Sequence, residues 1–276
     1  MVAWATAGLR MQLSALVVAS ALLLLPQQPG YAAEPTARAS QVDQQALIAE
    51  MLASVHPSDG TPRLYFVGFA GYGPEAVFKR EVIAVRKLFD ERFGTKARSV
   101  ALINHASTAE ELPLASADNL ERVLRHLGKV MHPERDTLFL FLTSHGDPKV
   151  FAVEMPGVRL EHLTPGKLRD VLDASGIQKR IVVLSSCFSG SFIPALAGPN
   201  TLVITAARGD RPSFGCSDKR VWTYFGDAYF NRALRRETSF KKAFHRAEQL
   251  VKRWERAQRL QPSLPQMSGG EALGLE

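Results

Sequence analysis

One histidine and one cysteine stand where an acid–base group and a nucleophile would be expected. His145 follows the apolar run 138–142, and Cys187 follows the apolar run 181–184, each after two small polar residues. A thiol is a strong nucleophile only as the thiolate, and a nearby imidazole can take up its proton and later return it to a leaving group. The pair therefore predicts nucleophilic catalysis by cysteine with histidine as its partner.

Small residues accompany both side chains. Gly146 directly follows the histidine, and its backbone N–H could point at an oxyanion together with that of Cys187. Ser186 and Gly190 keep the surroundings of the thiol open. A lone histidine or a lone cysteine after a strand is usually structural, but the two together, in this setting, favour a catalytic dyad.

The sequence gives little support to other kinds of site. Neither Cys-x-x-Cys nor His-x-x-x-His occurs, so no metal is predicted. The serine-hydrolase motif Gly-x-Ser-x-Gly is absent. The glycine-rich stretch 68–73 lacks the Gly-Lys-Ser/Thr ending of a phosphate loop, which disfavours nucleotide binding. We therefore expect no cofactor.

The elements that must position the dyad follow from apolar spacing. Apolar strands alternating with helices predict one domain with a mainly parallel sheet covered on both faces. Sites in such sheets form outside the carboxyl ends of the strands, where His145 and Cys187 both lie. Strands are expected at 64–67, 99–103, 138–142, 181–184 and 202–204, a hairpin at 149–160, an edge strand in the tail 261–276, and helices at 40–55, 75–93, 116–130, from 164, 219–235 and 239–259.

Residues 1–33 are typical of a secretory signal peptide. Arg10 precedes the apolar run 13–25, and helix-breaking and small residues follow it. We expect cleavage near Ala32 or Ala33, or retention as an N-terminal anchor, and hence a periplasmic or secreted protein with no other membrane span. A disulfide between Cys187 and Cys216 is the inert alternative to a reactive thiol.

Positive charge is concentrated late in the chain. The formal net charge is +7, and the excess of Lys and Arg lies mainly between residues 232 and 259. The solvated face of a helix is the simplest interpretation, with attraction to anionic lipid or acidic polymers as the alternative. Nucleic acid is not expected as a partner of an exported protein.

The paired motifs resemble peptidase family C13, the legumains and the catalytic subunit of the GPI transamidase, and more broadly the caspase-like clan. The clan pattern is an apolar block followed by His-Gly and a second apolar block followed by a small residue and Cys. His145-Gly146 and Ser186-Cys187 match it here. The resemblance extends over about 62–232, and it includes the stretches 187–191, 205–207, 213–216 and 223–227.

The resemblance implies a caspase-like three-layer α/β/α sandwich with a six-stranded, mainly parallel sheet over 61–260, preceded by a helical segment at 34–60. It implies a cysteine endopeptidase acting on peptides or proteins, with Cys187 and His145 as the dyad and Gly146 in the oxyanion hole. A transpeptidase with the same dyad and a non-catalytic peptide-binding pseudopeptidase are the alternatives.

The resemblance also implies a pocket for the residue before the cut. Arg80, Ser213 and Asp227 match the positions that form it in the family. Ser185 stands where the family has an acid, and residues 78–81 replace the legumain sequence Asn-Tyr-Arg-His. These departures put a preference for asparagine in doubt. The oligomeric state is not predicted.

Overall fold

A computed structural model describes residues 43–274 of the chain. The contacts divide the chain into Met1–Ala32 and Ala33–Glu276, and the described residues all belong to the second unit. The predicted signal peptide over 1–33 lies outside them and stays a prediction. None of the helices within 43–274 combines the length and apolar character needed to cross a bilayer.

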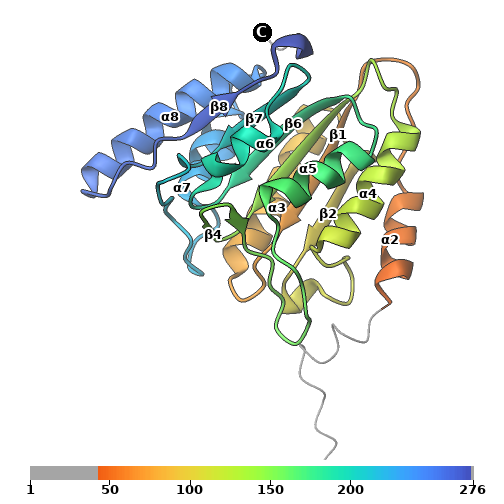
Figure 1. Cartoon of the computed structure of the whole chain (residues 1–276), viewed down its shortest axis with the longest axis horizontal. Helices are drawn as coiled ribbons and strands as arrows, with labels where there is room; N and C mark the ends of the chain where they lie inside the picture. The colour runs from red at the N-terminus through yellow and green to blue at the C-terminus, as the bar shows by residue number, and fades with distance from the viewer. Residues whose placement is uncertain (1–42, 275–276) are drawn as a thin grey trace, which may run out of the picture. The chain divides into compact units, whose positions relative to one another are not determined.

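A six-stranded sheet forms the centre of this unit, in the order β2-β1-β3-β6-β7-β8 (Figure 1). The first five of these strands are parallel, and β8 pairs antiparallel with β7. Nearly every residue of the parallel strands is buried, as their continuous apolar runs predict. The strands are β1 (Leu64–Ala70), β2 (Ser99–Ile103), β3 (Thr137–Thr143), β6 (Lys179–Ser185), β7 (Thr201–Thr205) and β8 (Gln266–Ser268).

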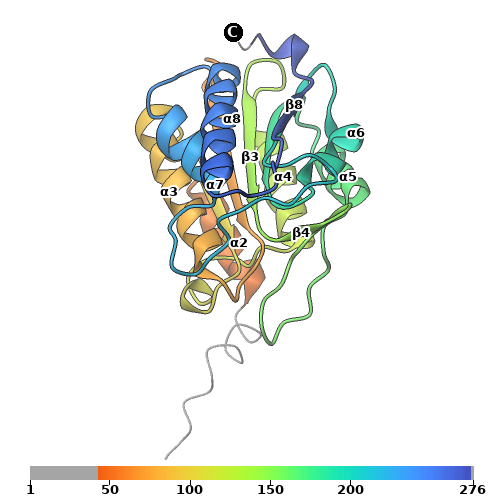
Figure 2. The same ribbon diagram turned by 90° about the vertical axis from the view of Figure 1, so that its left-hand side faces the viewer.

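Helices cover both faces of the sheet (Figures 1 and 2). Side chains that alternate along each strand enter opposite layers, so that Val67 packs in one core and Phe66 in the other. One core includes α2 (Gln44–Ala53), α4 (Ala117–Val130), α5 (Pro165–Ala174) and α6 (Ile193–Leu196). The other includes α3 (Ala76–Arg92), α7 (Tyr224–Gly226), the π-helical η3 (Asp227–Ala233) and α8 (Phe240–Ala257). The predicted three-layer sandwich is confirmed.

Two predicted elements differ from the structure. The expected hairpin at 149–160 forms in part, as isolated antiparallel bridges between Met155 and Val158 and between Phe151 and Leu163. A short hairpin of β4 (Gly146–Asp147) and β5 (Val150–Phe151) precedes it, with Lys149 at a φ of 62° in its turn. The expected helix at 219–235 begins only at Tyr224. The remaining short elements are the 3₁₀ helices η1 (Ala106–Thr108), η2 (Ser189–Phe192) and η4 (Glu271–Leu273).

Candidate active site

The loops that carry His145 and Cys187 leave neighbouring strands at the same edge of the sheet. Strands β3 and β6 are paired in register, with Thr143 opposite Ser185, and the backbone N–H of Ser144 donates to the Ser185 carbonyl at 3.2 Å. A Cβ added to Gly146 would come within 2.5 Å of the Cys187 carbonyl oxygen, closer than real Cβ atoms come. The two loops are therefore in contact, and residue 146 must be glycine for them to meet.

The His145 ring is held on three sides. The edges of Tyr72 and Phe78 meet it with ring centroids at 4.7 and 5.1 Å. Its Nε2 atom lies 3.2 Å from Oε2 of Glu75, and 36% of the side chain is exposed. That buried carboxylate oxygen has no hydrogen-bond partner in the described part of the chain, so it meets Nε2 at an ion-pair distance without forming a hydrogen bond. The imidazole thus has one fixed orientation and one carboxylate partner.

Glu75 is a site residue that sequence analysis missed. It directly precedes α3, at the N-cap position, on the loop that follows β1. Its carboxylate therefore lies at the positive end of a helix dipole and at the same carboxyl edge of the sheet as the two loops. That position at the edge was the only signal in the sequence that could have identified it.

The sulfur of Cys187 faces the backbone of Ser213. The N–H of Ser213 donates to Sγ at 3.2 Å, and Sγ lies 3.5 Å from the Ser213 carbonyl oxygen. Phe188, the next residue, has a φ of 54°, so the chain turns sharply away after the cysteine. The sulfur thus accepts from the N–H of Ser213 and donates to its carbonyl, so the Ser213 backbone holds the thiol in place.

The four predicted pocket residues have different surroundings. Ser213 touches the sulfur, whereas Ser185 is buried and lies 3.1 Å from Oγ1 of Thr223. Arg80 donates from Nε to the Arg220 carbonyl at 3.0 Å and also bonds the Asp218 carbonyl. Asp227 accepts from Asn231 at 2.7 Å and from Arg232 at 3.2 Å. Ser185 and Arg80 thus bind the segment 218–223, whereas Asp227 bonds within its own helix, and no contact joins Arg80 to Asp227 within residues 43–274.

The buried carboxyl group of Glu81 connects these segments to one another. Glu81, on α3, accepts a hydrogen bond from Thr143 Oγ1 at 2.6 Å and two from Thr223, from its N–H at 2.9 Å and its hydroxyl at 2.8 Å. Since the Thr223 hydroxyl proton goes to Glu81, Ser185 donates to Thr223. Burial raises the pKa of Glu81 to about 7. One side chain therefore links α3, the end of β3 and the residue that precedes α7.

Both cysteines are free thiols. The Cys187–Cys216 bond that the sequence left open is not formed in this structure. Burial raises the pKa of the Cys216 thiol, and the charges of Cys187, Glu81 and Glu75 raise it further. Cys216 is therefore a protonated thiol close to the site. Within residues 43–274, no group of three or more His, Cys, Asp and Glu side chains is arranged to hold a metal ion.

These features define a class: an α/β/α sandwich with a histidine and a cysteine loop at the carboxyl ends of adjacent parallel strands. The sequence model of the Peptidase C13 family matches residues 116–274, which is more than half of the chain, so the chain belongs to that family. The matched range contains His145 and Cys187, whereas Glu75, Arg80 and Glu81 precede it. Membership assigns the protein to the cysteine peptidases at the level of the family.

The fold is also found among solved structures. The chain is similar to caspase-1 from Spodoptera frugiperda, with a TM-score of 0.51 and 12% sequence identity over 78% of this chain and 88% of that one. At this identity the likeness shows the caspase fold alone. A search of curated proteins gave no match.

Proposed function

We propose that this protein is a cysteine endopeptidase in which Cys187 is the nucleophile and His145 its acid–base partner. One observation carries the proposal: β3 and β6 are in register up to their carboxyl ends, which brings the His145 and Cys187 loops into contact. The carboxylate of Glu75 beside the imidazole and the Ser213 N–H on the sulfur each add a polar contact to one member of the proposed dyad.

The reaction follows from these groups. His145 accepts the thiol proton, and the thiolate of Cys187 attacks the peptide carbonyl carbon. The N–H groups of Gly146 and Cys187 stabilise the negative oxygen that results. The imidazolium then gives its proton to the amine as the C–N bond breaks, which leaves a thioester on the enzyme. Water, deprotonated by His145, attacks the thioester, and the thiol is released with the carboxylic acid product.

Glu75 acts through His145 and is a positioning residue. The proposal gives Nδ1 the task of accepting the proton of the thiol, because Nε2 faces the Glu75 carboxylate at 3.2 Å. The same carboxylate stabilises the imidazolium that forms during attack. Histidine, carboxylate and cysteine would then work as one unit.

The proposed pocket for the residue before the cut consists of Arg80, Ser185, Ser213 and Asp227, with Ser213 nearest the sulfur. Arg80 is bound to backbone carbonyls and Asp227 to Arg232, so neither offers a free charge to a substrate. We therefore expect a preference for uncharged side chains at this position, without a strict requirement for asparagine.

Cleavage of a diverse peptide library by the wild type and by Cys187→Ala tests the function. Cleavage by the wild type alone is expected, and equal cleavage by both proteins contradicts the proposal. An added amine that is incorporated into the products would identify a transpeptidase. Binding of peptides without cleavage by the wild type would identify a pseudopeptidase.

We further propose that the enzyme works outside the cytoplasm, on the strength of the signal-like residues 1–33. The N-terminal sequence of the protein isolated from its own cells checks this. A start near residue 33 or 34 is expected, and a protein that keeps residues 1–33 in the cytoplasm contradicts it.

A further inference from the structure

The positive charge of this protein is concentrated in one segment. Residues 232–259 contain ten Lys and Arg and three acidic residues, an excess of seven that equals the formal net charge of the whole chain. The rest of the chain therefore contains equal numbers of basic and acidic residues. Nine of the ten basic side chains are exposed, namely Arg232, Arg235, Arg236, Lys242, Arg246, Lys252, Arg253, Arg256 and Arg259.

Helix α8 carries five of these nine cations and arranges four of them on one side. Its opposite side is in the core, where Phe240, Ala243, Phe244, Ala247 and Val251 are buried. Lys242, Arg246, Arg253 and Arg256 fall four, seven and three residues apart, which places them in one line along the exposed side. At 1.5 Å per residue this line is about 21 Å long. Because the apolar side is already covered, α8 can act at a surface only through its charges.

Much of this charge is free of acidic partners. Arg246 pairs with Glu237 at 3.2 Å, and Arg232 pairs with Asp227 at the same distance. Lys242, Lys252, Arg253, Arg256 and Arg259 have no acidic group within 4 Å in the described part of the chain. These five side chains are available to an external anion.

The cations also line hollows of suitable size. One hollow of about 390 Å³ lies between η3 and α8, with four arginines around it: Arg232, Arg235, Arg236 and Arg246. A second, of about 360 Å³, is lined by Lys252, Arg253 and Arg256 together with Gln249. Guanidinium groups bind phosphate through paired hydrogen bonds, so each hollow can receive a phosphate group.

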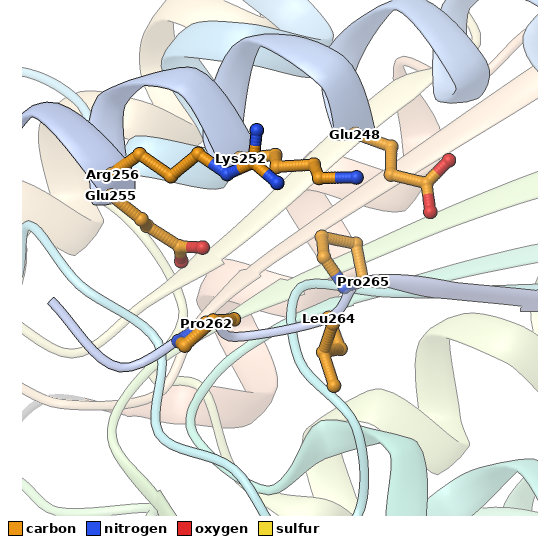
Figure 3. Close-up of a pocket in the computed structure, with 7 residues that line it drawn as sticks. All are labelled: Glu248, Lys252, Glu255, Arg256, Pro262, Leu264 and Pro265. Carbon is orange, nitrogen blue, oxygen red and sulfur yellow. The ribbon is translucent and has the colours of Figure 1, made fainter.

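An exposed apolar side chain lies at one rim of this surface. A third pocket, of about 160 Å³, separates α8 from the segment 262–265, and Figure 3 shows Lys252 and Arg256 on one side of it with Leu264 on the other. Leu264 is 40% exposed and is one of three large apolar side chains of the described residues that are exposed. A water-soluble polyanion needs only the charges, whereas a lipid surface also binds the leucine.

We propose that this surface, formed by the exposed cations of 232–259 and by Leu264, docks the protein on a bilayer rich in anionic lipid. The Lys and Arg side chains bind the headgroup phosphates, and Leu264 enters the interface beside them. Clusters of four to eight cations on an amphipathic helix bind such membranes, with a gain in affinity of about fivefold for each residue near the surface. The proposal is independent of the peptidase function.

Vesicle sedimentation with the full chain tests the docking. Binding to vesicles of phosphatidylglycerol and phosphatidylcholine is expected at about 0.1 M salt and is expected to disappear at about 1 M salt, where the screening length falls from about 10 Å to about 3 Å. Binding through the apolar residues 13–25 would instead persist at high salt and on pure phosphatidylcholine. The quantity to compare is therefore the difference in affinity between vesicles that contain phosphatidylglycerol and vesicles of pure phosphatidylcholine.

Two matched variants locate the surface. K252Q/R253Q/R256Q should lower the preference for vesicles that contain phosphatidylglycerol about a hundredfold. R122Q/K129Q/R159Q removes the same charge from exposed positions elsewhere and should leave this preference within about twofold. Equal losses in the two variants, or equal binding to both vesicle types, overturn the proposal.

Leu264→Ser separates a bilayer from a soluble polymer. It should weaken vesicle binding several-fold and leave retention on immobilised heparin unchanged, because only a lipid surface uses the leucine. An unchanged affinity for vesicles, with retention on heparin that depends on Lys252, Arg253 and Arg256, would assign the surface to a polyanion and overturn the membrane proposal.

Discussion

The strand ends and the loop that face each other at the site are held in place by different means. The ends of β3 and β6 are fixed by backbone hydrogen bonds that run up to Ser144 and Ser185. The loop 213–223 belongs to no strand and is fastened largely by side chains: Arg80 and Glu81 of α3 bind its backbone, and Asp218 accepts from the Ala76 N–H at 2.7 Å.

This difference separates the two tasks of the site. Backbone pairing does not depend on the identity of any one side chain, so residues 145 and 187 keep their places through many substitutions elsewhere in the strands. The loop depends on a few polar contacts, so single changes on α3 should move it. We expect substitution of the proposed catalytic side chains at the strand ends to remove the chemistry, and substitutions that release the loop to weaken substrate binding.

The two cysteines test this contrast most strongly, because one belongs to each region. Cys187→Ala should lower kcat/KM by about a thousandfold or more, since the nucleophile is lost. Cys216→Ala should keep it within about twofold, because burial raises the pKa of that thiol and keeps it protonated. Rates of peptide hydrolysis by the two purified variants test this prediction. A comparable loss of kcat/KM in both would contradict the proposed difference between the two regions.

Glu81 joins the two regions and should make stability depend on pH. Its pKa is raised to about 7 in the folded protein, so the unfolded chain, with a glutamate pKa near 4.5, releases this proton first as pH rises. The stabilising contribution is complete below about pH 4.5 and is lost as pH rises through about 7, a change on the order of 3 kcal/mol.

Glu81→Gln should remove this pH dependence. Urea unfolding between about pH 4 and 8 measures it, with Glu134→Gln, at an exposed position, as the control. If the wild type and Glu81→Gln show the same slope across this range, the carboxyl does not titrate as its burial implies.

Glu75 tests the role of the strand ends, because its carboxylate contacts His145. Glu75→Gln should lower kcat by about tenfold to a hundredfold with little change in KM, because the imidazole loses its charged partner while the substrate pocket is untouched. Glu75→Asp should recover part of the loss. Steady-state kinetics of both, beside the exposed Glu161→Gln, provide the test, and a change confined to KM would assign Glu75 to substrate binding.

Arg80 tests the role of the loop 213–223, and its substitution should have the smallest effect on activity of the four predictions. Arg80→Gln breaks the bonds to the Asp218 and Arg220 carbonyls and should raise KM several-fold while kcat stays within about twofold. Arg86→Gln, on the same helix and paired with Asp90 at 4.0 Å, is the matched control. A fall in kcat with an unchanged KM would show that the loop serves the chemistry as well.

The fold and the strand ends could be predicted because their signals are local. Apolar runs identify buried strands, and the register of parallel strands brings the residues that follow them to one edge. The loop 213–223 has no apolar period that would show where it ends, so the sequence places the start of the next helix too early, at 219. The structure begins it at Tyr224, after Thr223, which caps α7 by accepting from the Gly226 N–H at 3.0 Å. That cap depends on a contact with Glu81, which is distant in the sequence.

The two glutamates were missed for different reasons. Glu81 falls on the apolar side of α3, between Phe78 and Val82, and a charged residue at a buried helical position was a visible sign of a buried polar network. Glu75 has no such sign, because its partner His145 comes seventy residues later and only the folded sheet brings the two together.

The short strand β8 has a consequence for folding during synthesis. Its residues 266–268 cover the outer edge of β7, which ends at Thr205, about sixty residues earlier in the chain. Until residues 266–268 leave the ribosome, that edge presents unpaired backbone groups to any neighbouring polypeptide. Cleavage between α8 and β8 would expose the same edge in the finished protein, and aggregation would be the expected result.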